Sequence, residues 1–94
     1  DLSSANLRGA NLKASDLRNA TLTNADLVGA NLSDSDLRGA VFFGADLSNV
    51  NLKGAHTLGT EFNGSILCNT TMPDGHVEYS GCILKRIEEL LKRK

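Results

Sequence analysis

Aromatic residues, proline and long apolar runs are all scarce in this sequence. Its 94 residues contain no Trp, one Tyr, three Phe and one Pro. A compact globule of this size usually needs a mixed core of aromatic and branched side chains, so the composition argues against one. No apolar run approaches the length of a transmembrane span or of a signal-peptide core, and the sequence therefore predicts no membrane segment.

Net charge is also low. The formal net charge is −1, with eight acids against five bases in residues 1–75 and three acids against five bases in residues 76–94. Neither part carries enough charge of one sign to indicate a nucleic-acid partner or a membrane surface.

The sequence contains instead a five-residue unit that recurs from Asp1 to about Asp74. A bulky apolar residue stands at the centre of every unit but one, where Thr57 takes its place. The position two residues before each centre, from Ala5 onward, is always small, and is occupied by Ala, Ser, Thr or Val. The apolar centres are Leu2, Leu7, Leu12, Leu17, Leu22, Leu27, Leu32, Leu37, Phe42, Leu47, Leu52, Phe62, Leu67 and Met72.

A strict spacing of five fits neither an α-helix, which repeats every 3.6 residues, nor a flat strand, which repeats every two. Each unit must therefore contain a turn. Two positions after the centre, thirteen of fifteen residues are Gly, Asn or Asp, which tolerate the backbone of a tight corner, and only Ser4 and Ala14 depart from this rule. The pattern predicts a solenoid whose coils pair edge to edge, with two inward side chains per unit.

The units Ala5-Asn6-Leu7-Arg8-Gly9 and Ala25-Asp26-Leu27-Val28-Gly29 resemble the pentapeptide-repeat family. The resemblance covers residues 1 to 74 and implies an all-β solenoid, a right-handed quadrilateral β-helix with four units per coil. Similarities at a separation of twenty, such as Phe42 with Phe62 and Arg18 with Arg38, also indicate four units per coil. Fifteen units then make just under four coils. We expect two regions, a pentapeptide-repeat β-helix over 1–75 and a connector with a C-terminal helix over 76–94.

The C-terminal region changes character after Pro73-Asp74-Gly75, a strong turn signal. Residues 82–94 have apolar and charged residues at helical spacing, which predicts an amphipathic helix. At about twelve residues it is marginal alone in water and needs a surface to cover its stripe. We expect it to cap the exposed end of the last coil, whereas its mixed charges argue against a membrane-surface or calmodulin-target helix. The capping residues would be Ile83, Leu84, Ile87, Leu90 and Leu91.

One unit breaks the register, because its bulky residue is displaced from the centre at Thr57 to Leu58. Two interpretations compete. Either Thr57 stays inward and Leu58 lies on the surface, which keeps the coil regular, or a local bulge swings Leu58 into the core.

The two cysteines lie on the expected last coil and at the start of the expected capping helix. The segment around Cys68 and the Ser80-Gly81-Cys82 run resemble tails of cyanobacterial and plastid-lumen members of the family. The expected dock would bring the thiols together and allow a disulfide, while two buried thiols without a bond remain the alternative. A bridge would favour the thylakoid lumen or the periplasm, and its absence the cytoplasm.

No arrangement of residues indicates catalysis. His56 would stack above Asp36 and Asp16, but these positions point outward and a single His offers no metal-ligand set. Ser, His and Asp occur without the spacing of a nucleophile, its base and an orienting group. We therefore expect no enzyme activity, no metal and no cofactor.

Two functions remain, and the first is a non-catalytic structural or protein-interaction module with an unknown protein partner. The alternative is a DNA-mimicking inhibitor of a topoisomerase or another nucleic-acid enzyme, as some family members are. Arg18 and Arg38 lie beside Asp16 and Asp36 and weaken their field, which makes a nucleic-acid role the poorer fit. The chain starts inside the repeat without a Met, so we expect either upstream repeats or self-association through the N-terminal coil.

Overall fold

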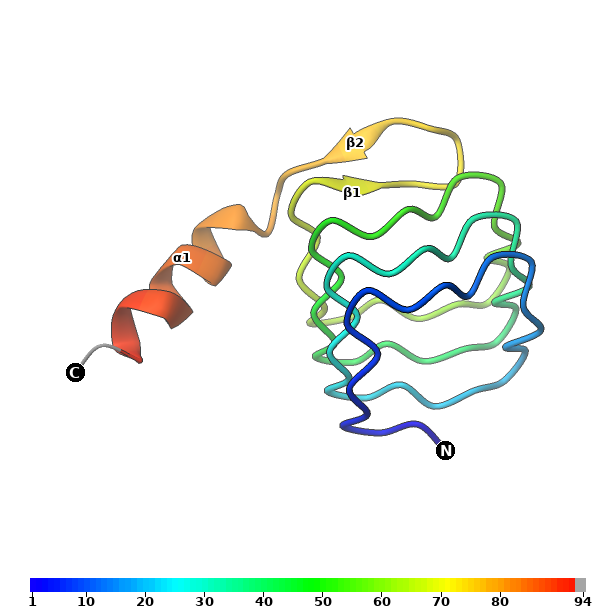
Figure 1. Cartoon of the computed structure of the whole chain (residues 1–94), viewed down its shortest axis with the longest axis horizontal. Coiled ribbons are helices and arrows are strands. Elements are labelled where there is room, and N and C mark those ends of the chain that lie inside the picture. Colours follow the sequence, from blue (N-terminus) through cyan, green and yellow to red (C-terminus); the bar gives the residue numbers. More distant parts are fainter. Residues whose placement is uncertain (93–94) are drawn as a thin grey trace.

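The computed structural model describes residues 1–92, and over the repeat region the chain winds into stacked coils (Figure 1). Isolated parallel bridges join residues twenty apart, beginning with Asn6 to Asp26 and ending with Asn51 to Thr71. Twenty residues correspond to four five-residue units. The extended piece of each unit is too short to count as a strand, because a corner follows it at once.

Backbone hydrogen bonds between successive coils hold the stack together. The N–H of Leu7 donates to the carbonyl of Asp26 at 2.8 Å, and the N–H of Asp26 donates back to the carbonyl of Ala5 at 2.9 Å. The same pattern recurs one coil later, where Leu27 donates to Asp46 at 3.0 Å and Asp46 donates to Ala25 at 3.0 Å. The units of the inner coils therefore satisfy their backbone groups through the coil before and the coil after.

The corners from Ser4 to Gly64 are each closed by a backbone hydrogen bond and have a positive φ at the third residue, as type II turns do. The N–H of Ala10 donates to the carbonyl of Leu7 at 3.0 Å, and the intervening Gly9 has a φ of 70°. Ala14 occupies the same position and adopts a φ of 58° although it carries a Cβ. Residues with a positive φ recur every five positions up to Asn69. The next one would be Asp74, but Gly75 has the positive φ instead, so the five-residue spacing of the corners ends there.

The unit centres form the core. Those of the inner coils are fully buried, whereas those toward the two ends of the stack are partly buried. Phe42 and Phe62 stack across one coil spacing with ring centroids 5.4 Å apart. The fully buried centres are Leu22, Leu27, Leu32, Leu37, Phe42, Leu47 and Leu52; the partly buried ones are Leu2, Leu7, Leu12, Leu17, Phe62, Leu67 and Met72.

At the irregular unit, Leu58 is 82% exposed and Thr57 is half-buried. The interpretation in which Thr57 stays inward is therefore confirmed, and the bulge is wrong. Thr60 opens the next unit, and its hydroxyl donates to the carbonyl of Leu37 in the coil before it at 2.5 Å.

The end of the chain forms a small hairpin and a helix. Strand β1 (Thr70–Thr71) pairs with antiparallel strand β2 (Val77–Glu78), so part of the expected connector adds a strand to the last coil. The helix α1 spans Cys82–Leu91. The expected helix over 82–94 thus ends earlier, and residues 93–94 lie outside the described part.

The expected cap over the end of the last coil is wrong. Helix α1 runs away from the coils instead of across them (Figure 1), and it has no buried residue. The reason is that β2 pairs with β1, while the N–H of Gly81 donates to the carbonyl of Leu67 at 2.9 Å and fixes the start of α1 at the side of the stack. All five expected capping side chains are exposed: Ile83, Leu84, Ile87, Leu90 and Leu91.

Candidate functional site

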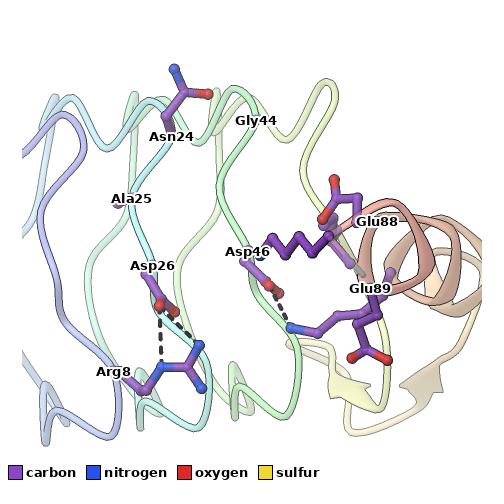
Figure 2. Close-up of a pocket in the computed structure, with 11 residues that line it drawn as sticks. Arg8, Asn24, Ala25, Asp26, Gly44, Asp46, Glu88 and Glu89 are labelled. Atoms are coloured by element: carbon purple, nitrogen blue, oxygen red, sulfur yellow. Dashed lines mark hydrogen bonds and ion pairs between the residues drawn. The ribbon is translucent and has the colours of Figure 1, made fainter. Parts of the chain in front are cut away.

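The candidate site is the groove between α1 and one face of the solenoid, which we call the α1 groove (Figure 2). It encloses about 370 Å³. The solenoid contributes one column of outward positions, and α1 contributes its charged side. The charged residues that line the groove are Arg8, Asp26, Asp46, Lys85, Glu88, Glu89 and Lys92.

An ion pair crosses the α1 groove at its inner end. Lys85 Nζ lies 2.5 Å from Asp46 Oδ2, and both side chains are about three-quarters covered. The other oxygen of Asp46 accepts the hydroxyl of Ser48 at 2.6 Å and its N–H at 3.0 Å. Burial opposes ionisation of Asp46, but the hydrogen bonds from Lys85 and Ser48 outweigh it and lower the pKa of this carboxyl. Asp46 therefore stays charged and holds α1 to the solenoid.

The start of α1 is attached to the solenoid at two further points. Cys82 forms a disulfide with Cys68, with the Cα atoms 4.7 Å apart, so the structure contains the pair that the sequence left open. A Cβ on Gly81 would lie 2.8 Å from Leu67 N and 3.1 Å from Leu67 O, so only glycine allows this approach. Ile66 is buried beneath this junction.

The orientation of α1 is the reverse of the usual arrangement for an amphipathic helix. Its polar residues Lys85, Glu88, Glu89 and Lys92 line the groove beside the solenoid. Apart from Cys82, Lys85 is the least exposed residue of the helix. The apolar residues face away from the solenoid and are 45–73% exposed. Helix α1 therefore presents an apolar face to its surroundings, formed by Ile83, Leu84, Ile87, Leu90 and Leu91.

Three other aspartates of the solenoid are paired with arginines. Arg38 forms a bidentate pair with Asp36, with Nη2 2.6 Å from Oδ2, and this hydrogen bonding lowers the pKa of Asp36 to about 2. Arg18 pairs in the same way with Asp16 at 2.8 Å, and Arg8 pairs with Asp26 at 3.0 Å. The arginine of each pair comes from the same coil as the aspartate or, for Arg8, from the neighbouring coil, and it screens the negative charge of these columns.

The histidines are placed differently. The backbone of His56 forms a parallel β-bridge with that of Asp36, so His56 lies in the column that the sequence predicts. His76 lies at the hairpin, with Nδ1 2.5 Å from Asp74 Oδ1 and Nε2 3.5 Å from Glu78 Oε2, and these carboxylates raise the pKa of His76. Over residues 1–92 no three His, Cys, Asp or Glu side chains gather as a metal site, and no helix is long and apolar enough to cross a membrane.

Sequence reasoning missed Asp46 and Ile66 as contacts of α1. A signal for Ile66 existed, because the column that includes Asn6, Asp26 and Asp46 is polar until Ile66 replaces the carboxylate. This break in a polar column singles out Ile66, although Leu58 is also apolar at an outward position and stays exposed. No comparable signal distinguishes Asp46, since Asp occurs at that position in several units.

Comparisons with known proteins agree with the fold. The family described as Pentapeptide repeats matches residues 1–39 and 45–74 in eight copies. The solved structure of the pentapeptide repeat protein Rfr23 from the cyanobacterium Cyanothece 51142 is 38% identical over 69% of this chain, with a TM-score of 0.60. The comparison with curated proteins found no significant match.

Two further solved structures are similar in sequence but superpose less well. HetL from the cyanobacterium Nostoc, which is involved in heterocyst differentiation regulation, is 34% identical over 83% of this chain, with a TM-score of 0.36. AT2G44920 from the Arabidopsis thaliana thylakoid lumen is 30% identical over 89% of this chain and 72% of its own, with a TM-score of 0.33.

The chain spans 48% of the length of Rfr23 and 43% of that of HetL. The family match nevertheless covers more than half of the present sequence. The β-bridges between residues twenty apart run from Asn6 to Thr71, within the region that the family match covers. The protein belongs to the pentapeptide-repeat family, whose members form right-handed quadrilateral β-helices.

Proposed function

We propose that this protein is a non-catalytic protein-interaction module. In this proposal the solenoid, of just under four coils, is a rigid scaffold that presents α1 to a protein partner. One observation carries the proposal: α1 places its charged residues against the solenoid and its five apolar residues outward. Pentapeptide-repeat proteins are in general structural repeat proteins, which agrees with a binding role rather than a catalytic one.

The energetics of α1 support an interaction role. An isolated helix of ten residues is marginal in water, and complete burial of one Leu or Ile side chain contributes about 1.5–3 kcal/mol. The apolar face of α1 leaves roughly half or more of each side chain in water. A partner surface that covers it would recover a large part of this free energy and stabilise the helix.

The way α1 is attached also suits presentation to a partner. The disulfide, the Gly81 backbone bond and the Lys85–Asp46 ion pair all lie in the first half of α1 or just before it. Ile87, Leu90 and Leu91 lie beyond these attachments, so a partner can reach them without displacing the solenoid. Ordering the helix in advance reduces the entropy lost on binding.

No observation of the structure specifically favours the alternative, a DNA-mimicking inhibitor of a topoisomerase or another nucleic-acid enzyme. A mimic of duplex DNA needs an uncompensated row of negative charge. Asp16, Asp26 and Asp36 are each paired with an arginine, so the charge along these columns is largely neutralised. We therefore keep the interaction module as the proposal.

We also propose an oxidising compartment, such as the thylakoid lumen or the periplasm. The support is the Cys68–Cys82 disulfide, since stable disulfides persist outside the reducing cytoplasm.

A capture experiment with two variants tests the interaction module. We expect immobilised protein to retain a partner protein from an extract of the source cells, and Ile87→Asp to abolish this because it buries a carboxylate in the interface. Leu58→Asp is the matched control, because Leu58 is exposed on the solenoid away from α1. Equal capture by both variants, or no capture by the unchanged protein, would contradict the proposal.

A further inference from the structure

We infer that the Cys68–Cys82 disulfide is a redox latch: a dithiol reductant opens it in the folded protein, and α1 then leaves the solenoid. The inference rests on the proposed function in one respect, because it takes α1 to be the element that a partner recognises. It adds the regulation of that recognition. The latch is closed under the oxidising conditions proposed above, and the closed form presents α1.

The disulfide joins two parts of the chain that share no core. Cys68 belongs to the last coil of the solenoid, and Cys82 is the first residue of α1. No residue of α1 is buried, and the hydrophobic core includes none of its side chains. Opening the bridge therefore leaves the core contacts of the solenoid in place. The bond controls the position of α1 and not the folding of the coils.

Two contacts still hold the start of α1 when the bridge is open. One is the backbone hydrogen bond from the N–H of Gly81 to the carbonyl of Leu67, and the other is the Lys85–Asp46 ion pair. Linkage is reciprocal, so the bridge stabilises the docked helix by as much as docking stabilises the bridge. Because these two contacts are weak, the folded chain adds little resistance to reduction.

The bridge is also open to a reductant. Cys68 and Cys82 are both half-buried, and the residues that follow them, Asn69 and Ile83, are exposed. The bond thus lies at the surface of the molecule, beside the stack and outside the core. A reductant can reach it without unfolding a coil.

The position of Cys82 makes it the better leaving group of the two cysteines. The N-terminus of a helix favours negative charge and lowers the pKa of a thiol there, and the first turn of α1 has no acidic residue that would oppose this effect. A thiolate of the reductant attacks Cys68 Sγ and forms a new S–S bond with it. The Cys68–Cys82 bond breaks, and its electron pair leaves on Cys82 Sγ.

The second thiol of the reductant completes the reaction. As a thiolate it attacks the reductant's own sulfur in the mixed disulfide and releases Cys68 as a thiolate. The reductant ends as a disulfide, its two electrons reduce the protein bond, and its two protons pass to the two cysteine thiolates. An oxidant that removes these electrons and protons closes the latch again.

Opening the latch changes what the protein presents. Lys85 leaves Asp46, and the charged side of α1 withdraws from the α1 groove (Figure 2). A detached helix of ten residues is marginal in water. A partner of α1 must then order the helix before it can bind, which lowers its apparent affinity by the fraction of ordered helix.

Limited proteolysis of the full chain tests the latch without a partner. One sample is reduced with dithiothreitol, alkylated and freed of reductant, and trypsin is added to it and to the oxidised chain. We expect cleavage after Arg86 to be about a hundredfold faster in the opened chain, because cleavage follows the detached population and a bridge across this loop changes that population about a hundredfold. Arg38 is the internal control and should stay uncut in both samples, since its carbonyl accepts the N–H of Asn19 in the coil before it at 2.9 Å.

The double variant Cys68→Ser, Cys82→Ser separates the effect of the bond from that of the reagents. It should be cleaved after Arg86 as fast as the reduced chain, whether or not it has been treated with dithiothreitol. Re-oxidation of the reduced chain before alkylation should restore slow cleavage, because a latch is reversible.

Capture of a partner in the two states tests the regulation. We expect the oxidised chain to retain a partner protein from an extract of the source cells, and the double variant to retain about tenfold less or weaker still. Equal capture by the two chains would overturn the regulation. No capture by either chain would contradict the proposed function, and proteolysis would still decide the latch.

Two further results would overturn the latch itself. The first is a bridge that dithiothreitol opens only at denaturant concentrations that unfold the solenoid. The second is an opened chain in which Arg86 is cleaved no faster than in the oxidised chain.

Discussion

Reduction of the Cys68–Cys82 disulfide should release α1 while the solenoid remains folded. The two cysteines are fourteen residues apart, and a loop of this length corresponds to about 3 kcal/mol of stabilisation in the chain-entropy model. The other attachments are one backbone hydrogen bond and the partly covered Lys85–Asp46 pair. Together these contribute on the order of 2 kcal/mol, too little to hold a helix that is marginal alone.

The expected magnitude follows from the lost free energy. A change of about 1.4 kcal/mol corresponds to a factor of ten in an equilibrium constant, so loss of the disulfide should raise the detached population of α1 about a hundredfold. Hydrogen exchange measures this population directly, through the amides of α1. The double variant Cys68→Ser, Cys82→Ser avoids free thiols and should exchange a hundredfold faster there than the oxidised chain.

The solenoid provides the internal reference. The N–H of Leu37 donates to the carbonyl of His56 at 2.8 Å inside the stack and should keep its protection. Unchanged protection of α1 in the double variant would refute the reasoning, because the ion pair and the backbone bond would then be sufficient. Equal loss of protection at α1 and at Leu37 would also refute it, because the helix and the solenoid would unfold together.

Three further predictions concern the solenoid and the hairpin. Leu37→Ala should lower the free energy of unfolding by about 2–5 kcal/mol, since Leu37 is fully buried. Leu7→Ala should lower it less, because Leu7 is only partly buried. Equal shifts of the denaturation midpoint for the two variants would be inconsistent with burial by stacking. Ala14→Gly should stabilise by roughly 0.5–1 kcal/mol, because Ala14 has a φ of 58°, and a lower midpoint would contradict this. The raised pKa of His76 means that its pairing stabilises the hairpin below the ordinary value of 6.5 and that this contribution disappears as pH rises through the raised value. A midpoint at or below 6.5 in an NMR titration of His76 would show that the carboxylates do not act on it.

The sequence alone was sufficient for the solenoid because the controlling interactions repeat locally. A bulky residue every five positions, with a small one two residues before it, defines the inward columns without knowledge of the rest of the chain. Gly, Asn or Asp at the corner supplies the positive φ of the turn. Ala14 and Ser4 follow the same backbone without the favoured side chains, because their N–H groups donate to Ser33 and Thr23 of the second coil.

The direction of α1 was decided by the tertiary structure. Its amphipathic pattern states only that the apolar residues require cover, and the nearest uncovered surface was the end of the last coil. Strand β2 pairs with β1 at that end instead. Residues 76–80 show no pattern that predicts a strand, because only Val77 and Glu78 form it.

The candidate site depends on contacts between distant residues for the same reason. Lys85 and Asp46 are 39 residues apart, and each is ordinary within its own segment. Their pairing requires the disulfide and the close approach of Gly81 to Leu67, which together place the start of α1 beside the Asp46 column. Periodicity reports which side of a helix is apolar, but only the attachment of that helix to the folded chain determines which side faces the solvent.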